Sequence, residues 1–119
     1  MPNAIVLDAN ALMMPFQFKL HLDRELKRLF GELPVFVPSS VIGELARSID
    51  PKAKAALALA RKYQIAETDL SGDEAVIDMA ERRSAAVVTN DRELIARLRE
   101  KKVPVIRLRG QHYLVADEF

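Results

Sequence analysis

The chain has 119 residues, half of them hydrophobic, and a formal net charge of +1 at pH 7. This length suits one domain with a core of its own, so residues 1–119 are expected to fold as a single domain without cross-links. Cysteine is absent, which excludes disulfides, thiolate zinc sites and cysteine nucleophiles and is consistent with a cytoplasmic location.

Neither a secretion signal nor a membrane helix is visible in the sequence. The first apolar stretch begins at Ala4 and is interrupted by Asp8, too early for the apolar region of a signal peptide. The longest uninterrupted apolar run, Ala55 to Ala60, is far below the roughly 20 residues that a membrane helix needs. We therefore expect a soluble, cytoplasmic protein without a membrane partner.

The N-terminal third alternates strand and helix signals. Ala4 to Leu7 is a short apolar run typical of a buried strand. Large apolar residues then recur at helical spacing from Phe18 to Phe30 and predict an amphipathic helix that ends at Gly31. Val35 to Val37, between two prolines, predicts a short strand, and Ser39 or Ser40 is the expected cap of the next helix.

The middle of the chain carries two helix starts. Asp50-Pro51 places a capping acid before a proline and predicts an alanine-rich helix that extends to about Tyr63. Gln64 to Ala66 is compatible with a brief strand. Ser71 and Glu74 match a capping box, which predicts that Ser71 caps a helix and that Glu74 reaches back to it.

The last third contains two more apolar strands. Ala85 to Val88 predicts a buried strand, and Thr89-Asn90-Asp91 predicts the turn into another helix. Val103 to Leu108 is the expected last strand of a parallel set. Strands separated by helices indicate right-handed crossovers, so we predict a three-layer α/β/α fold with a small, mostly parallel central sheet.

Four carboxylates lie where a short apolar run gives way to a helical pattern: Asp8, Glu44, Asp73 and Asp91. In an open parallel sheet the carboxyl ends of all strands point to one edge, so these four side chains are expected to converge in one crevice. The convergence predicts a site that is built from acidic side chains.

Each of these acids also has an ordinary structural explanation, because capping and the helix macrodipole favour acids near helix N-termini. Asp73 and Asp91 fit that explanation. Asp8 ends a buried strand and precedes no clear helix that it could cap, and Glu44 lies among apolar residues rather than on an evident polar face. The two acids without an ordinary role indicate a functional constellation.

Carboxylates gathered in a cleft repel one another, and a divalent cation is the natural compensation. Oxygen ligands favour Mg²⁺ or Mn²⁺ over zinc, and one or two such ions can activate water for attack on a phosphodiester. Asn10, Thr89 and Asn90 are neutral neighbours that can orient ligands or contact phosphate.

The segment between Arg92 and Arg109 carries seven basic residues against two acidic ones. A basic flank beside an acidic centre suits a phosphodiester substrate. The alternative is that these are ordinary solvated positions on a helix and an edge strand.

Three segments resemble the motifs of PIN domains: Ile5 to Asn10, Pro38 to Leu45, and Val87 to Leu94. The segment from Asp73 to Ala80 is similar to a further motif, in which Glu74 or Asp78 is an alternative to Asp73. The resemblance extends from Ile5 to about Leu108 and implies a metal-dependent endoribonuclease that cleaves single-stranded RNA.

By this resemblance Asp8, Glu44, Asp73 and Asp91 would be the catalytic and metal-binding acids. The same match implies residues that support these acids or contact the substrate: Asn10, Ser40, Thr89, Asn90 and Arg92. Members of the family are often homodimers.

The tail from Val103 to Arg109, followed by Gln111-His112-Tyr113, is similar to that of PIN proteins that process ribosomal RNA in archaea and eukaryotes. This favours RNA maturation with a ribosome-assembly partner. The alternatives are a ribonuclease toxin paired with an antitoxin and a PIN domain that binds RNA without cutting it. A receiver-like α/β domain is a remote alternative, since no clear lysine ends a late strand.

Overall fold

The central strand of the molecule is the first one in the chain. In the computed structural model, which describes residues 1–117, six strands form one sheet in the order β3-β2-β1-β4-β5-β6. Strand β1 (Ala4–Leu7) lies between β2 (Val35–Pro38) and β4 (Ala85–Val88) and is parallel to both. Every residue of β1 and β4 is buried, which explains why these strands are continuous apolar runs without alternation.

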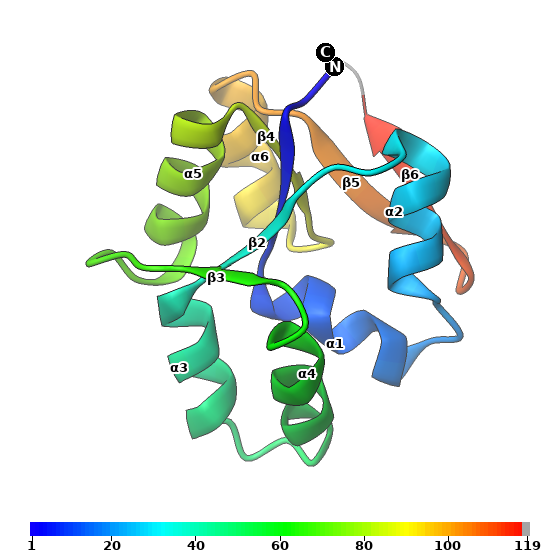
Figure 1. The fold of residues 1–119 in the computed structure, drawn as a ribbon, viewed down its shortest axis with the longest axis vertical. Coiled ribbons are helices and arrows are strands. Elements are labelled where there is room, and N and C mark those ends of the chain that lie inside the picture. The colour runs from blue at the N-terminus through cyan, green and yellow to red at the C-terminus, as the bar shows by residue number, and fades with distance from the viewer. Residues whose placement is uncertain (118–119) are drawn as a thin grey trace.

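The other strands are β3 (Gln64–Ala66), β5 (Val105–Arg109) and β6 (Tyr113–Asp117). The helices are α1 (Ala9–Gln17), α2 (Leu22–Phe30), α3 (Ser39–Arg47), α4 (Lys52–Ala60), α5 (Gly72–Arg83) and α6 (Arg92–Glu100). The first five strands are parallel, and their connections place α5 and α6 on one side of the sheet and α1, α2 and α4 on the other (Figure 1). The predicted three-layer α/β/α fold is confirmed.

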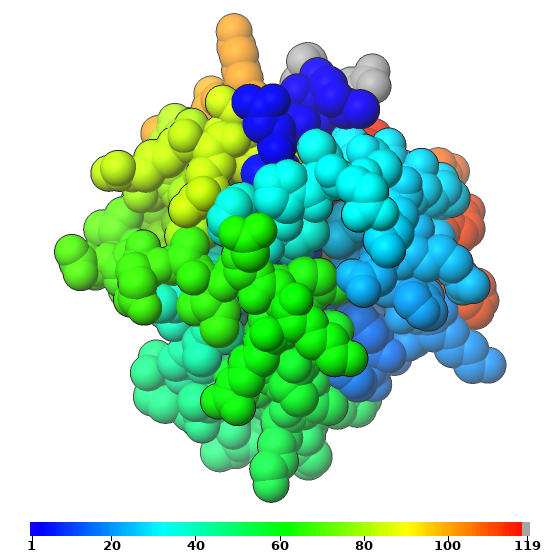
Figure 2. Space-filling view, in the orientation of Figure 1, coloured from blue at the N-terminus to red at the C-terminus, as the bar shows by residue number. Residues whose placement is uncertain are grey.

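One end of the molecule is built from helices that follow strand ends. The carboxyl ends of β1 and β2 lead to α1 and α3, and these two helices pack against each other and against α4 (Figure 1). In the space-filling view, β2, β3 and α4 cover much of the visible face, so that little of the buried strand β1 is seen (Figure 2). The edge of the sheet that receives the predicted acids therefore lies under a helical cluster.

The predicted helix from Phe18 to Phe30 is shorter than its apolar spacing suggested. Phe18 is the C-terminal cap of α1, and α2 begins at Leu22 after His21, whose Nδ1 accepts the backbone N–H of Arg24 at 3.3 Å. The predicted end at Gly31 is confirmed, and its φ of 69° is a conformation that glycine adopts without strain.

Strand β6 was not predicted from the sequence. After a turn at Gly110 it runs antiparallel to β5, so β5 is not the last strand of the sheet. Helix α2 covers the free edge of β6: Glu25 accepts the backbone N–H of Leu114 at 2.9 Å, and Arg28 donates to the carbonyl of Leu114 at 2.7 Å. Glu25 and Arg28 also pair with each other at 2.9 Å, and this bond lowers the pKa of Glu25. An otherwise unpaired sheet edge is thus satisfied by side chains of one helix.

Within residues 1–117, no helix combines the length and the apolar character needed to span a membrane.

Replacing Glu25 with alanine is expected to lower the free energy of unfolding by about 1.5–3 kcal/mol, because a buried acceptor of charge-assisted hydrogen bonds is lost. The matched control is Glu32→Ala, which removes only an exposed ion pair to Lys27 and should change stability by less than about 0.5 kcal/mol. Urea unfolding measures both, and hydrogen exchange at the Leu114 amide should accelerate only in the first variant. Equal effects of the two substitutions would contradict this role of Glu25.

Candidate active site

Asp8 is the most buried acid of the predicted set, with 8% of its surface exposed. It follows β1 directly, and its Oδ1 accepts the backbone N–H of Ala11 at 2.7 Å. Its pKa is raised to about 7, chiefly by burial; the nearby carboxylates of Asp91 and Glu44 act in the same direction, and hydrogen bonds from Thr89 and Ala11 act against it. This carboxyl group is buried without a cation beside it, which is costly for the charged form.

The prediction that Asp8 caps no helix is wrong, because Asp8 is the N-cap of α1. This helix was missed because residues 9–17 carry no charged side chain to mark a solvated face and include Pro15, a helix-breaking residue. Asp8 therefore has an ordinary structural role in addition to its electrostatic anomaly.

Asp91 lies at the carboxyl end of the neighbouring strand β4. It is the N-cap of α6 and accepts the backbone N–H of Leu94 at 3.1 Å, while its own N–H donates to Thr89 Oγ1 at 3.0 Å. Thr89 is fully buried, and its hydroxyl also hydrogen-bonds to the carboxylate of Asp8. One threonine thus joins the two acids that end the two central parallel strands.

Glu44 is in the second turn of α3, as predicted, but its side chain is exposed rather than packed among the apolar residues around it. It lines a cavity of about 540 Å³ together with Asn10. One turn earlier, the hydroxyl of Ser40 is buried and has no hydrogen-bond partner among the described residues. Ser40 and Glu44 are four residues apart and so share a face of the helix.

Asp73 lies in the first turn of α5, as predicted, and is partly exposed. Burial and the charge of Asp91 raise its pKa, whereas Arg97 lowers it. The nearest guanidinium nitrogen of Arg97 is 3.9 Å from its carboxylate. Ser71 is the N-cap residue of α5, as predicted, but the predicted capping box is wrong, because Ser71 makes no side-chain capping bond and Glu74 forms a close ion pair with Arg97 instead.

The two alternatives to Asp73 both form ion pairs with arginines. Glu74 is largely exposed and paired with Arg97. Asp78 pairs with Arg82 at 2.9 Å and lines a separate cavity beside residues 67–70. The charge of Asp91 raises the pKa of Asp73, which couples Asp73 to the acid at the end of β4.

Asn10 and Asn90 tie the site's loops together. The side-chain oxygen of Asn10 accepts the backbone N–H of Asn90 at 2.7 Å, and the side-chain oxygen of Asn90 accepts that of Leu108 at 2.9 Å. These bonds connect α1, the loop after β4 and strand β5. Arg92 is the first residue of α6 and is exposed next to Asp91.

The acids are coupled electrostatically but do not form a finished ligand set. The charges of Asp91 and Glu44 raise the pKa of Asp8, and the charge of Asp91 raises the pKa of Asp73. Among residues 1–117, no three histidine or acidic side chains are arranged to hold a metal ion as they stand. The donor chemistry nevertheless fits a hard cation: carboxylates, one of them buried without a counter-charge, and the unpartnered hydroxyl of Ser40.

The predicted basic flank is partly neutralised. Arg97 pairs with Glu74 and Asp73, and Lys101 pairs with Glu81. Arg99 and Arg107 both bind Asp117 of β6, at 2.7 and 2.8 Å. For these four residues the alternative explanation holds, because their charges serve contacts within the protein.

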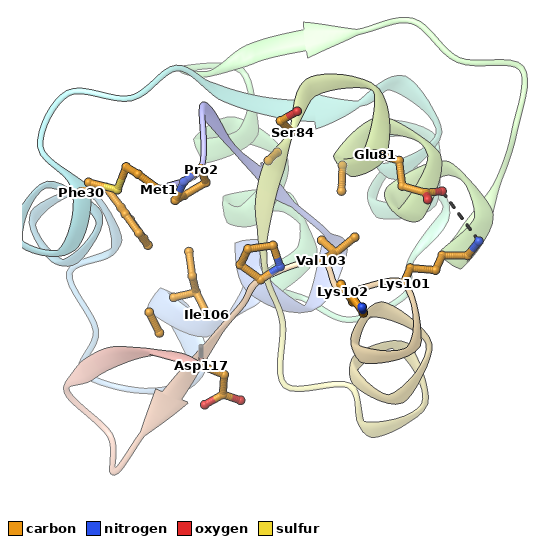
Figure 3. A pocket seen from close by; sticks show the side chains of 14 residues that line it. Met1, Pro2, Phe30, Glu81, Ser84, Lys101, Lys102, Val103, Ile106 and Asp117 are labelled. Atoms are coloured by element: carbon orange, nitrogen blue, oxygen red, sulfur yellow. Dashed lines mark ion pairs between the residues drawn. The ribbon is translucent and has the colours of Figure 1, made fainter. Parts of the chain in front are cut away.

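A larger cavity, of about 760 Å³, lies at the opposite edge of the sheet (Figure 3). It is bordered by the N-terminus, by Phe30 and by residues before β4 and β5, and its labelled ion pair joins Glu81 and Lys101. None of the four predicted acids lines it. The larger cavity is therefore separate from the candidate site defined by the four acids.

Fold and site together define an open α/β domain whose acidic side chains gather at the carboxyl edge of a parallel sheet. A family model described as a PIN like domain matches residues 5–111. The chain belongs to this family, as its three motifs suggested.

Two curated relatives are ribonucleases. Ribonuclease VapC4 of Methanocaldococcus jannaschii is 33% identical over 121 residues, with 92% of each chain covered. Ribonuclease VapC9 of Archaeoglobus fulgidus is 31% identical over 107 residues, which cover 84% of this chain and 78% of that one.

Among solved structures, the PIN domain endonuclease Utp24 matches with a TM-score of 0.84 over 99% of this chain and 93% of its own. Its sequence identity is 18%, so this likeness shows a shared fold.

The raised pKa of Asp8 predicts a specific pH dependence in metal-free protein. Between the ordinary value of 3.8 and about 7, the folded state binds more protons than the unfolded state, so the free energy of unfolding should fall as the pH rises through this range. The loss due to Asp8 is at most about 4 kcal/mol.

Urea unfolding in EDTA at pH 5 and pH 7.5 measures this loss as the difference between wild type and Asp8→Asn. Asparagine keeps the helix cap and cannot ionise, so the variant should gain stability relative to wild type at the higher pH. A difference that does not change with pH would contradict the assignment.

Proposed function

We propose that the protein is a metal-dependent endoribonuclease that hydrolyses phosphodiester bonds in single-stranded RNA. The carrying observation is the buried Asp8, which is coupled to Asp91 and Glu44 at the carboxyl edge of the sheet without a balancing cation. The names of the two ribonuclease relatives support the reaction and the substrate class.

In this proposal Asp8, Glu44, Asp73 and Asp91 hold one or two Mg²⁺ or Mn²⁺ ions. When bound, such ions supply an activated water and stabilise the leaving oxygen of a phosphodiester. Mg²⁺ keeps several waters and completes its shell with phosphate, so the acids need not form a closed cage before RNA binds.

The protein side chains differ in how firmly they are held. Asp8 is fixed by Ala11 and Thr89, and Asp91 by Leu94, so both carboxylates are pre-oriented. Glu44 is exposed and free to turn toward a cation, whereas Asp73 must exchange Arg97 for it. In the proposal Ser40 and Asn10 support the acids, and Asn90 and Arg92 contact the RNA backbone.

The biological role follows less directly from the residues. We propose RNA maturation, because of the tail that forms β5 and β6, with a ribosome-assembly partner in the cytoplasm. A toxin paired with an antitoxin is the second candidate, and the ribonuclease relatives are compatible with both. Growth arrest on expression in bacteria, relieved by the product of a neighbouring small gene, would favour the toxin role.

Asp8→Asn and Asp91→Asn are each expected to reduce cleavage of a labelled single-stranded RNA by roughly 100-fold or more, because each removes a charge that the transition state requires. Asparagine preserves both helix caps, so circular dichroism should remain that of wild type. EDTA should abolish wild-type cleavage, and Mn²⁺ should restore it. Metal-independent cleavage, or full activity in both variants, would contradict the four-acid site.

The third acid can be assigned by comparing three substitutions on one helix. Asp73→Asn is expected to lose cleavage, whereas Glu74→Gln and Asp78→Asn should stay within about threefold of wild type, since Glu74 is largely exposed and Asp78 pairs with Arg82. The measurement is the initial rate of cleavage at a saturating Mn²⁺ concentration. Loss of activity in Asp78→Asn with retention in Asp73→Asn would exchange the two roles.

A further inference from the structure

A groove leaves the acidic site between α1 and α3. It has a volume of about 540 Å³, within the range of small-ligand pockets. Its α1 side is formed by Asn10, Met13 and Gln17, which recur at helical spacing, and its α3 side includes Glu44 and Arg47. From Asn10 to Gln17 the groove extends roughly 10 Å along α1. The groove therefore carries Asn10 and one of the four candidate acids, Glu44.

Arg47 is the cation of this groove. It is exposed and lines the cavity, and its side chain makes no ion pair or hydrogen bond with another residue in the described part of the chain. Its guanidinium folds back over Gly43: a Cβ at position 43 would lie 3.0 Å from Nη1 and 3.8 Å from Cζ of Arg47. A glycine in a helix interior weakens the helix, and here it leaves the space that the guanidinium occupies.

Neither acid that lines the groove forms an ion pair with Arg47. Glu44 is three residues before it, a spacing that allows an ion pair, but their charged atoms are more than 4.0 Å apart. Asp50 is engaged instead with its own loop, since its carboxylate accepts the backbone N–H of Lys52 at 2.9 Å and its N–H donates to Ser48 at 3.2 Å. An unpaired guanidinium thus faces a groove that begins at the acids.

We propose that this groove is an RNA subsite, in which Arg47 binds a phosphate that flanks the scissile bond and the α1 residues Met13 and Gln17 border the adjoining nucleotide. The proposal rests on the proposed ribonuclease function and deepens it. Guanidinium geometry matches phosphate oxygens in two parallel hydrogen bonds. In this proposal Glu44 binds the cation at one end of the groove, and Arg47 binds the phosphate further along it.

The test uses the full chain and a labelled single-stranded oligoribonucleotide. Binding is measured with Ca²⁺ at several salt concentrations, and cleavage is measured with Mn²⁺. Arg47→Ala is expected to raise Kd and KM about tenfold with a much smaller change in kcat, because a binding contact is lost. The slope of log Kd against log salt should decrease by about 0.7, the value for one phosphate on a single strand.

The matched control is Arg61→Ala. Arg61 is also exposed and has no ion pair within residues 1–117, but it lies at the far end of α4 and does not line the groove. Its substitution should leave Kd, KM and the salt slope unchanged. Arg47→Lys should keep the salt slope but recover only part of the affinity, since lysine retains the charge without the planar fork.

Gly43→Ala separates binding from folding. Alanine favours the helix, and the new methyl group would displace the flexible end of Arg47, so the Tm should rise while RNA binding weakens. In the Arg47→Ala background the same substitution should raise the Tm without a further effect on binding.

Three outcomes decide the proposal. The predicted changes in Arg47→Ala, with Arg61→Ala unchanged, support it. Wild-type cleavage combined with an unaltered Kd and salt slope in Arg47→Ala overturns the subsite and leaves the ribonuclease function intact. A wild-type protein that neither binds nor cuts RNA overturns both.

Discussion

The position of β1 between β2 and β4 is the constraint on which the site depends. From β1 the chain moves outward to β2 and β3, then returns to pair β4 with the other side of β1. The order of the strands reverses at this point, where crevices form at the carboxyl edge of open α/β sheets. Asp8 and Asp91 are the first acidic residues after β1 and β4, the two strands that pair there. The topology therefore brings them together although they are more than eighty residues apart in the chain.

The metal-free site is an electrostatic compromise. Asp8 is buried because it follows the central strand and caps α1, and this burial shifts its carboxyl group toward the protonated form. Asp73 finds a substitute counter-charge in Arg97, and Glu44 remains exposed. In the proposed function, a divalent cation bound at this edge would compensate a buried charge that is unfavourable for the isolated fold.

Much of the fold was predictable because buried parallel strands are visible as apolar runs. Ala85 to Val88 and Ala4 to Leu7 were recognised with their observed bounds. Helix α1 was missed because it lacks charged residues and contains Pro15. Strand β6 was missed because its docking depends on Glu25 and Arg28, which are distant in sequence and look like the solvated face of an amphipathic helix. Long-range pairing of this kind leaves no local pattern.

The candidate site was predictable as a set of residues, but its geometry was not. Three of the acids lie at strand or helix ends as the sequence predicts, and Glu44 lies in the second turn of α3. The pairing of Asp73 with Arg97 and the burial of Asp8 required the structure. Arg47 was not singled out at all. The sequence shows only that Arg47 follows Glu44 by three residues and Gly43 by four. The structure was needed to show that its guanidinium lies over the glycine.

The most direct test of the central claim is to locate a bound divalent cation by NMR with paramagnetic Mn²⁺. The account predicts that substoichiometric Mn²⁺ selectively broadens the amide signals of Ala9, Thr89 and Asp91, leaves those of Ser84 and Lys102 at the opposite edge sharp, and has no such effect in Asp8→Asn. Broadening centred on the opposite edge, or the same pattern in wild type and variant, would contradict a metal site built on Asp8.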